Sequence, residues 1–352
     1  LYRSGAERSA GKEDHRGEIR QLVTIARVWS EKVQDADAAA EALEQVLGRD
    51  PENVMALTEL ARLYETTEQW DRCAEILEKA AALGPEPEEG AEIEFRLGRV
   101  KANQTGDEEA AALHYERALE LKPSHDEAAK ALQQFAKNAG SWDRVAELME
   151  TRARFVSEKD QLKIFCELGR VYSDKLKQPN SSVETWERAR VLDSDNVDIL
   201  TPLAHAYLEA DRLDDAEPLL EQLVEKAGRK RNKQVAVYQS QLGAIASKRG
   251  DAQKALNHYE QAHKIDSTNP DTLIALGRIY FDQQNWDSAR RIYRSMLLQN
   301  IEGGVLSKSE IFLNLGRVHA QMGEIAKAKN MFERGLEIDS DNAELKAELE
   351  RM

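Results

Sequence analysis

The chain lacks long apolar runs and has almost no cysteine. No stretch approaches the 18 consecutive apolar residues that a membrane-spanning helix needs. The two cysteines among the 352 residues, Cys73 and Cys166, lie 93 positions apart, a spacing that suits neither a disulfide framework nor a metal site. We therefore expect no membrane span, no bound metal and a reducing compartment, with the cytoplasm favoured although the sequence does not identify it.

Positive charge is also in short supply. Lys and Arg number 49 against 64 Asp and Glu, which gives a formal net charge of −15. Nucleic-acid binding relies on Lys and Arg to displace counterions, so this balance argues against a nucleic-acid partner. About half of the chain is Ala, Glu, Lys, Leu and Arg, a share typical of long helices and helical arrays. The composition therefore argues against a β-sandwich and against a doubly wound α/β fold.

Motifs that carry enzyme chemistry are missing. Gly5 to Lys12 has five residues between its glycines and Glu13 after its lysine, so it is not a phosphate-binding loop. The acidic stretch 193–196 has Val197 and Asp198 where a calcium loop needs an oxygen ligand and a glycine, and it recurs at 339–342 as an ordinary turn. The seven histidines are scattered. We expect no enzyme activity, no cofactor and no small-molecule substrate.

A repeat of about 35 residues runs through the chain. Leu57, Leu60, Ala61 and Tyr64 form one apolar helical stripe, and a second stripe follows after a polar break at 66–69. Equivalent units begin at residues 19, 54, 91, 126, 162, 197, 236, 270 and 309, and a truncated tenth begins at 343. The eighth position of each unit is almost always small: Ala26, Ala61, Gly98, Gln133, Gly169, Ala204, Gly243, Gly277 and Gly316. Each unit is thus predicted to be a pair of closely packed helices.

This pattern resembles the tetratricopeptide repeat, a helical hairpin of 34 residues with small residues at fixed positions. The resemblance implies an all-α protein, an α-solenoid superhelix of antiparallel helical hairpins, whose first helices line a concave groove. We expect a polar lead-in at residues 1–18, nine repeats at 19–342, and a truncated helix of a tenth repeat or a cap at 343–352. The fourth unit fits worst, because Gln133 occupies the small position and Arg152 stands where alanine is usual.

Pairs of units form a larger block of about 72 residues. The longer spacings between unit starts follow the even-numbered units, so longer connections are expected at about 84–91, 226–236 and 298–309. Extra turns of the second helix are expected to take up part of the added length. The Gly303-Gly304 pair indicates a break in the last of these. Asparagine is expected to cap four first helices, because its side chain accepts an otherwise unpaired backbone N–H: Asn53, Asn196, Asn269 and Asn342. The dense basic run at 229–231 is interpreted as a solvated helix end.

The ninth position of the units is rich in arginine and supplies the candidate binding residues: Arg27, Arg62, Arg99, Arg170, Arg278 and Arg317. The resemblance implies that this position faces the groove. Guanidinium groups grip carboxylates in bidentate fashion, so one interpretation is a stripe that contacts an acidic partner. The alternative is that each arginine pairs with a carboxylate of a neighbouring helix, such as Glu65 or Asp282. The asparagines by which carboxylate-clamp repeats hold a peptide terminus are replaced by arginine here.

These observations favour a non-enzymatic scaffold for protein–protein interaction, which holds a partner protein or peptide in its groove. One alternative is a regulatory or adaptor arm of a larger enzyme or signalling protein, whose active domain lies outside this segment. The chain begins at Leu1 rather than methionine, which fits a piece of a longer protein. A peptide-sensing or RNA-contacting solenoid is a third class, and the acidic balance weighs against RNA.

Overall fold

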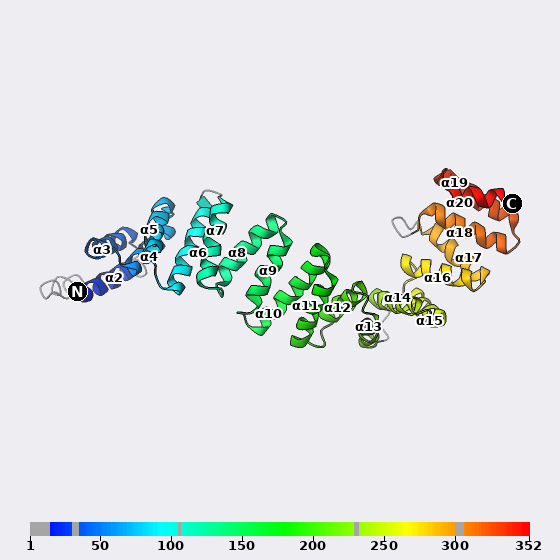
Figure 1. The fold of residues 1–352 in the computed structure, drawn as a ribbon, viewed down its shortest axis with the longest axis horizontal. Helices are drawn as coiled ribbons and strands as arrows, with labels where there is room; N and C mark the ends of the chain where they lie inside the picture. Colours follow the sequence, from blue (N-terminus) through cyan, green and yellow to red (C-terminus); the bar gives the residue numbers. More distant parts are fainter. Residues whose placement is uncertain (1–14, 30–34, 105–106, 229–231, 300–305) are drawn as a thin grey trace. The chain divides into compact units, whose positions relative to one another are not determined.

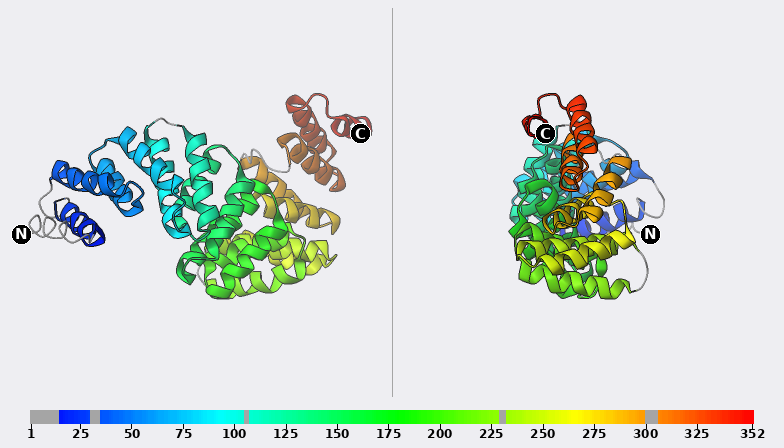
Figure 2. Two further views of the ribbon diagram at one scale, coloured as in Figure 1. Left: turned by 60° about the vertical axis from the view of Figure 1, so that its left-hand side comes forward. Right: turned by 90° about the vertical axis from the view of Figure 1, so that its right-hand side faces the viewer.

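The computed structural model describes residues 15–29, 35–104, 107–228, 232–299 and 306–352. Within these residues the chain forms 19 α-helices and one π-helix, and no strand. The chain divides into two compact units, Leu1–Lys177 and Gln178–Met352. Within each unit consecutive helices pack as hairpins, and neighbouring hairpins lie side by side (Figure 1, Figure 2). The expected all-α solenoid of helical hairpins is confirmed.

The first unit contains four complete hairpins and the first helix of a fifth. Its helices are α2 (His15–Val28), α3 (Ala36–Arg49), α4 (Val54–Thr66), α5 (Trp70–Ala82), α6 (Pro87–Gln104), α7 (Glu108–Leu121), α8 (Asp126–Asn138), α9 (Trp142–Ala153), α10 (Glu158–Arg170) and the π-helix η2 (Val171–Leu176).

The second unit begins with the second helix of the fifth repeat and contains four further hairpins. Its helices are α11 (Pro179–Leu192), α12 (Val197–Glu209), α13 (Leu213–Ala227), α14 (Lys233–Lys248), α15 (Ala252–Ile265), α16 (Pro270–Asp282), α17 (Trp286–Leu298), α18 (Lys308–Gln321), α19 (Ile325–Ile338) and α20 (Ala343–Glu350).

The small eighth position sets the distance between the two helices of a hairpin. A Cβ atom built on Gly98 would lie 2.6 Å from the ring of Tyr115, and one on Gly316 would lie 2.3 Å from the ring of Phe332. Real Cβ contacts are never this short, so the aromatic ring of the second helix fills the place that a side chain would take. Tyr115 and Phe332 are buried as a result. The prediction of close packing at this position is confirmed.

The predicted asparagine caps are present on all four helices. In each, the side-chain oxygen accepts a backbone N–H of the first helical turn: Asn53 caps α4, Asn196 caps α12, Asn269 caps α16 and Asn342 caps α20. Pro270 occupies the first turn of α16, where its missing N–H costs no hydrogen bond. The stretches at 193–196 and 339–342 are therefore turns that lead into capped helices.

The predicted connections need correction. Residues 83–86 link α5 to α6 in four residues, as short as the links before α4 and α8, and the extra length extends the start of α6 instead of the end of α5. The expectation of an extended second helix is wrong there, because Pro87 begins a helix earlier than the repeat register does. The expected connection at 298–309 falls mainly on residues 300–305, which lie outside the described residues. Gly303-Gly304 and the basic run at 229–231 lie outside the described residues.

The expected lead-in at residues 1–18 is described only in its last four residues. These belong to helix α2, which covers His15–Val28. Glu18 in its first turn is buried and pairs with Arg49 of α3 at 2.8 Å. Because this ion pair ties the first turn of α2 to its hairpin partner, residues 15–18 belong to the first repeat.

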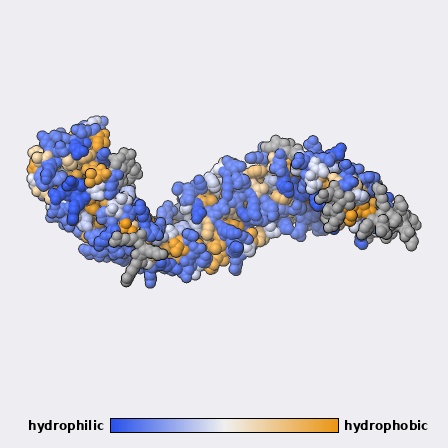
Figure 3. Space-filling view, turned by 180° about the vertical axis from the view of Figure 1, so that it is seen from behind, coloured by the Kyte–Doolittle hydropathy of each residue, from blue (hydrophilic) through white to orange (hydrophobic). Residues whose placement is uncertain are grey.

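The surface is predominantly hydrophilic. On the face drawn in Figure 3, apolar residues form small groups among charged ones. No helix in the described parts of the chain combines the length and apolar character that a membrane crossing requires. Exposed large apolar side chains such as Val191 and Leu298 lie on different helices.

Candidate functional site

The six candidate arginines are divided between the two units. Arg27, Arg62, Arg99 and Arg170 lie on first helices of the first unit, and Arg278 and Arg317 lie on first helices of the second. Arg27 and Arg62 line one small cavity of about 10 Å³, together with Glu59. The structure therefore brings these two arginines together at the N-terminal end of the chain.

Two of the arginines are paired with carboxylates of the chain itself. Arg62 lies 2.9 Å from Glu59, one turn earlier on α4. Arg317 contacts Glu348 at 2.8 Å and Glu344 at 3.0 Å, both on α20. The Arg62 pair is solvent-exposed and contributes little, whereas the two carboxylates on Arg317 compensate its charge fully. Arg317 is thus a structural link between α18 and α20.

The other four arginines are exposed. Among the described residues, none of the ion pairs involves Arg27, Arg99, Arg170 or Arg278. The guanidinium of Arg99 lies 5.9 Å from the centre of the Phe95 ring on the same helix, which is a cation–π contact. The alternative interpretation required each arginine to pair with a carboxylate of the chain. For these four arginines, no such ion pair is found in the described part of the chain.

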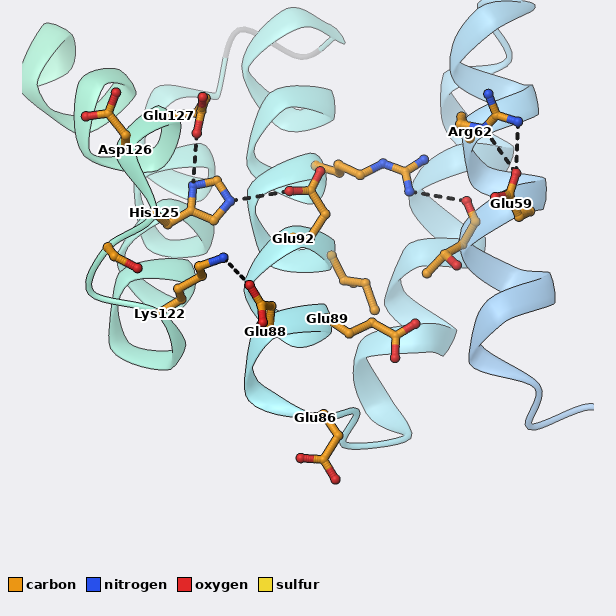
Figure 4. Close-up of a pocket in the computed structure, with 14 residues that line it drawn as sticks. Glu59, Arg62, Glu86, Glu88, Glu89, Glu92, Lys122, His125, Asp126 and Glu127 are labelled. Carbon is orange, nitrogen blue, oxygen red and sulfur yellow. Dashed lines mark hydrogen bonds and ion pairs between the residues drawn. The ribbon is translucent and has the colours of Figure 1, made fainter. Parts of the chain in front are cut away.

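A pocket of about 760 Å³ lies in the first unit, and Arg62 is one of the residues that line it (Figure 4). It is formed by the first helices α4, α6 and α8 and by the loops that precede α6 and α8. We call it the A-helix pocket. Its lining residues are Thr58, Glu59, Arg62, Glu86, Glu88, Glu89, Glu92, Ile93, Arg96, Lys122, Ser124, His125, Asp126 and Glu127.

The early start of α6 supplies one wall of this pocket. Pro87 opens the helix, and Glu88 and Glu89 follow in its first turn, where the helix dipole favours negative charge. Glu88 forms an ion pair with Lys122, which lies in the loop before α8 (Figure 4). The hydrogen bond from Lys122 lowers the pKa of Glu88 below its usual range. Glu88 therefore stays charged well into mildly acidic solution.

His125 fixes the opposite wall. Its Nδ1 accepts the backbone N–H of Ala128 at 3.2 Å and so caps α8. Because Nδ1 is the acceptor, a neutral ring carries its proton on Nε2, which lies 3.4 Å from Glu92. The ring also packs on Phe95, with ring centres 4.8 Å apart. His125 is buried and joins α8 to α6.

Arg96 forms the floor between α6 and α4. Its Nε donates to Glu65 at 2.9 Å, and its Nη1 donates to the backbone oxygen of Thr58 at 3.2 Å. The residue is 8% exposed. Its Nη2 is buried and has no hydrogen-bond partner within the described residues. A buried donor without an acceptor is costly, and the two hydrogen bonds and the Glu65 carboxylate hold the rest of the guanidinium in place.

The A-helix pocket is acidic despite the arginines beside it. Seven carboxylates line it against three permanent cations. The sequence pattern of ninth positions identified Arg62 but missed Arg96, His125 and the glutamates, because these lie at other positions of the repeat. The acidic turn at 84–90 was the available signal, since its glutamates lie at the point where one hairpin leads into the next.

Within the described ranges no group of three or more His, Cys, Asp and Glu side chains is placed to hold a metal ion. The pocket's carboxylates are spread over three helices and one loop. What the arrangement offers is a charged surface with hydrogen-bonding groups, which suits recognition of a chain segment.

Family models of the tetratricopeptide repeat match most of the chain. One matches residues 32–93 and 246–300, a second matches 196–268, and a third matches 92–125 and 309–342. Together these segments cover about two thirds of the sequence, and all of them match models of the same repeat. No curated protein sequence matches the chain.

Solved structures of similar fold share little sequence with this chain. MamA is 22% identical with a TM-score of 0.39, over 50% of this chain and 92% of its own. YrrB, described as a TPR protein with an unusual peptide-binding site, is 18% identical with a TM-score of 0.38, over 56% and 96%. The pilF protein of Pseudomonas aeruginosa is 15% identical with a TM-score of 0.41, over 76% and 100%. Such values carry no information on ligands.

Repeated matches to models of one family, in a chain built from helical hairpins, establish its relationship. The chain belongs to the tetratricopeptide repeat family, whose repeats generally act as non-enzymatic modules that bind proteins or peptides.

Proposed function

We propose that this protein is an interaction scaffold that holds a segment of a partner protein against the first helices of its N-terminal unit. The A-helix pocket carries the proposal, because three successive first helices contribute to one opening of about 760 Å³. A segment that crosses from α4 to α8 would contact three repeats at once. Contacts spread in this way suit an extended chain better than a compact small molecule.

The polar character of the pocket supports the same conclusion. Thr58 and Ser124 offer hydroxyl groups, and Ile93 offers an apolar contact between the charged side chains. An extended peptide presents backbone amides and side chains of alternating direction, which such a mixture can pair with. The four arginines without ion pairs among the described residues are proposed as further contacts. Of these, Arg99 lies on the pocket helix α6, and Arg27 lies on α2, the first helix of the repeat before α4.

Site-specific photocrosslinking tests this proposal. A photoreactive residue placed at position 62, which lines the pocket, is expected to crosslink a partner protein in native lysate. The matched control places the same residue at Lys79 of α5, which is exposed on the second helix of the same hairpin. Crosslinking from position 79 but not from position 62 would place the partner on the other face and contradict the proposal.

Charge reversal tests the arginines separately. Arg27→Glu and Arg99→Glu are each expected to weaken partner capture while the helical content and melting temperature stay nearly unchanged, because both side chains are exposed. Arg62→Glu should act in the same direction and also repel Glu59 at the pocket edge. Unchanged capture by all three variants would show that these arginines do not contact the partner.

A further inference from the structure

The A-helix pocket carries an imbalance of charge that specifies its ligand more closely. Several of its carboxylates already have partners: Glu59 pairs with Arg62, Glu88 with Lys122, and Asp126 with Arg152 and Lys130. Glu86 and Glu89 are exposed, and neither takes part in an ion pair within the described residues. Glu89 lies in the first turn of α6 and Glu86 in the link just before it, and both border the opening (Figure 4).

The cations of the pocket cannot compensate these two glutamates. Arg96 is held by Glu65, which lies outside the lining, and Lys122 is held by Glu88. The Nε2 atom of His125 already faces Glu92 at 3.4 Å. Each basic group therefore already has a carboxylate, and the surplus around the opening is negative. An acidic ligand entering here would meet repulsion.

We infer that the pocket binds a lysine- or arginine-containing segment of the partner, with a basic side chain at the edge of the opening that Glu86 and Glu89 border. The inference rests on the proposed function and adds the charge of the residue that enters the pocket.

This assignment differs from the acidic partner expected from the arginine positions alone. Arg62 is one of the pocket's lining residues, yet its neighbour Glu59 already faces it at 2.9 Å. A segment with a basic residue in the pocket can still present carboxylates to Arg27 or Arg99, which line no part of it. The two expectations therefore concern different residues of the partner.

Labelled peptides test the inference on the full chain. Three decapeptides share the same neutral residues and carry four lysines, four glutamates or four glutamines. Their binding is followed by fluorescence anisotropy at about 150 mM salt, where long-range attraction to an acidic protein is largely screened. The lysine peptide is expected to bind at least about tenfold more tightly than the other two.

A pair of matched variants separates the pocket from general negative charge. Glu86→Gln/Glu89→Gln removes two charges at the pocket opening. Glu108→Gln/Glu109→Gln removes two exposed charges from the first turn of α7, which lies at the opposite end of the α6–α7 hairpin. The first variant is expected to weaken lysine-peptide binding about tenfold and the second less than twofold.

The outcomes distinguish the two proposals. Equal losses in both variants, or equal binding of the glutamate peptide, would overturn the inference of a basic ligand. If the inference of a basic ligand fails but a partner still crosslinks from position 62, the proposed function stands on its own. If position 62 yields no crosslink and no peptide binds, both proposals fail. Selective loss in the Glu86→Gln/Glu89→Gln variant supports the inference.

Discussion

Arg152 of α9 donates a hydrogen bond of 2.7 Å to the side-chain oxygen of Gln133 on α8. Gln133 occupies the position that is glycine or alanine in the other repeats, and it is buried. Arg152 also contacts Asp126 at 2.8 Å. In the fourth repeat, therefore, a hydrogen-bonded polar pair joins two positions at which small residues are usual. The repeat that fits the family pattern worst keeps its hairpin because both irregular residues satisfy each other.

Coupling between these two residues is the first prediction. Arg152→Leu leaves Gln133 buried without its donor and should lower the free energy of unfolding by about 2 kcal/mol. Gln133→Ala/Arg152→Leu removes both polar partners and should recover much of that loss. Chemical denaturation of the two single variants and the double variant measures the coupling. Additive losses would mean that the two side chains do not depend on each other.

Glycine at the eighth position is predicted to be required where the partner ring is closest. In Gly316→Ala the new methyl group would lie 2.3 Å from the Phe332 ring, so the variant should lose about 1 to 3 kcal/mol. Gly48→Ala is the control, because no atom lies within 4 Å of its new Cβ and alanine favours a helix. Thermal unfolding should show destabilisation in the first and none in the second. Similar melting temperatures would contradict the packing argument.

Acid sensitivity is predicted for the last complete hairpin. Glu324 accepts hydrogen bonds from Lys327 and His319, which lower its pKa to about 2. A carboxyl whose pKa falls on folding stabilises the folded state above its ordinary pKa of 4.5, and this stability is lost as the pH falls toward 2. The difference in melting temperature between wild type and Glu324→Gln should therefore be present at pH 5 and shrink below about 4.5.

Glu337 provides the control for that measurement. It is exposed on the same helix, α19, and belongs to none of the ion pairs that involve the described residues. The difference in melting temperature between wild type and Glu337→Gln should therefore not change as the pH falls from 5 toward 2. A pH profile of Glu324→Gln that runs parallel to wild type down to pH 2 would show that the cluster around Glu324 does not contribute.

Arg317 and Arg278 occupy the same repeat position and are predicted to behave differently. Arg317→Ala removes the partner of Glu344 and Glu348, so the backbone amides of α20 should exchange with solvent faster. Leu345 stays buried and keeps the helix in place. Arg278→Ala should leave exchange unchanged, because Arg278 is exposed and has no ion pair in the described ranges. Hydrogen exchange followed helix by helix measures both, and equal protection of α20 in the two variants would refute the structural role.

The candidate site shows where sequence reasoning stops. Position within the repeat identified Arg62, since a periodic pattern tells which residues share a face. It could not foresee that Glu59 lies 2.9 Å from Arg62, because side-chain pairing depends on rotamers and not on spacing. Nor could it place Arg96, which reaches Glu65 on the preceding hairpin's first helix. The Arg96–Glu65 contact joins residues 31 positions apart, and it exists only once hairpins stack.

The sequence by itself determined the helical hairpins, the capped helix starts and the small positions, because all of these depend on local periodicity and on the shape of single residues. The tertiary structure alone decided the charge of the pocket. Pro87 starts α6 early, and Glu88 in its first turn contacts Lys122 of the next repeat, while Glu92 faces His125 one turn further on. The sign of the surface therefore depends on which charged side chains neutralise each other across repeats, and the distances that decide this are set by stacking.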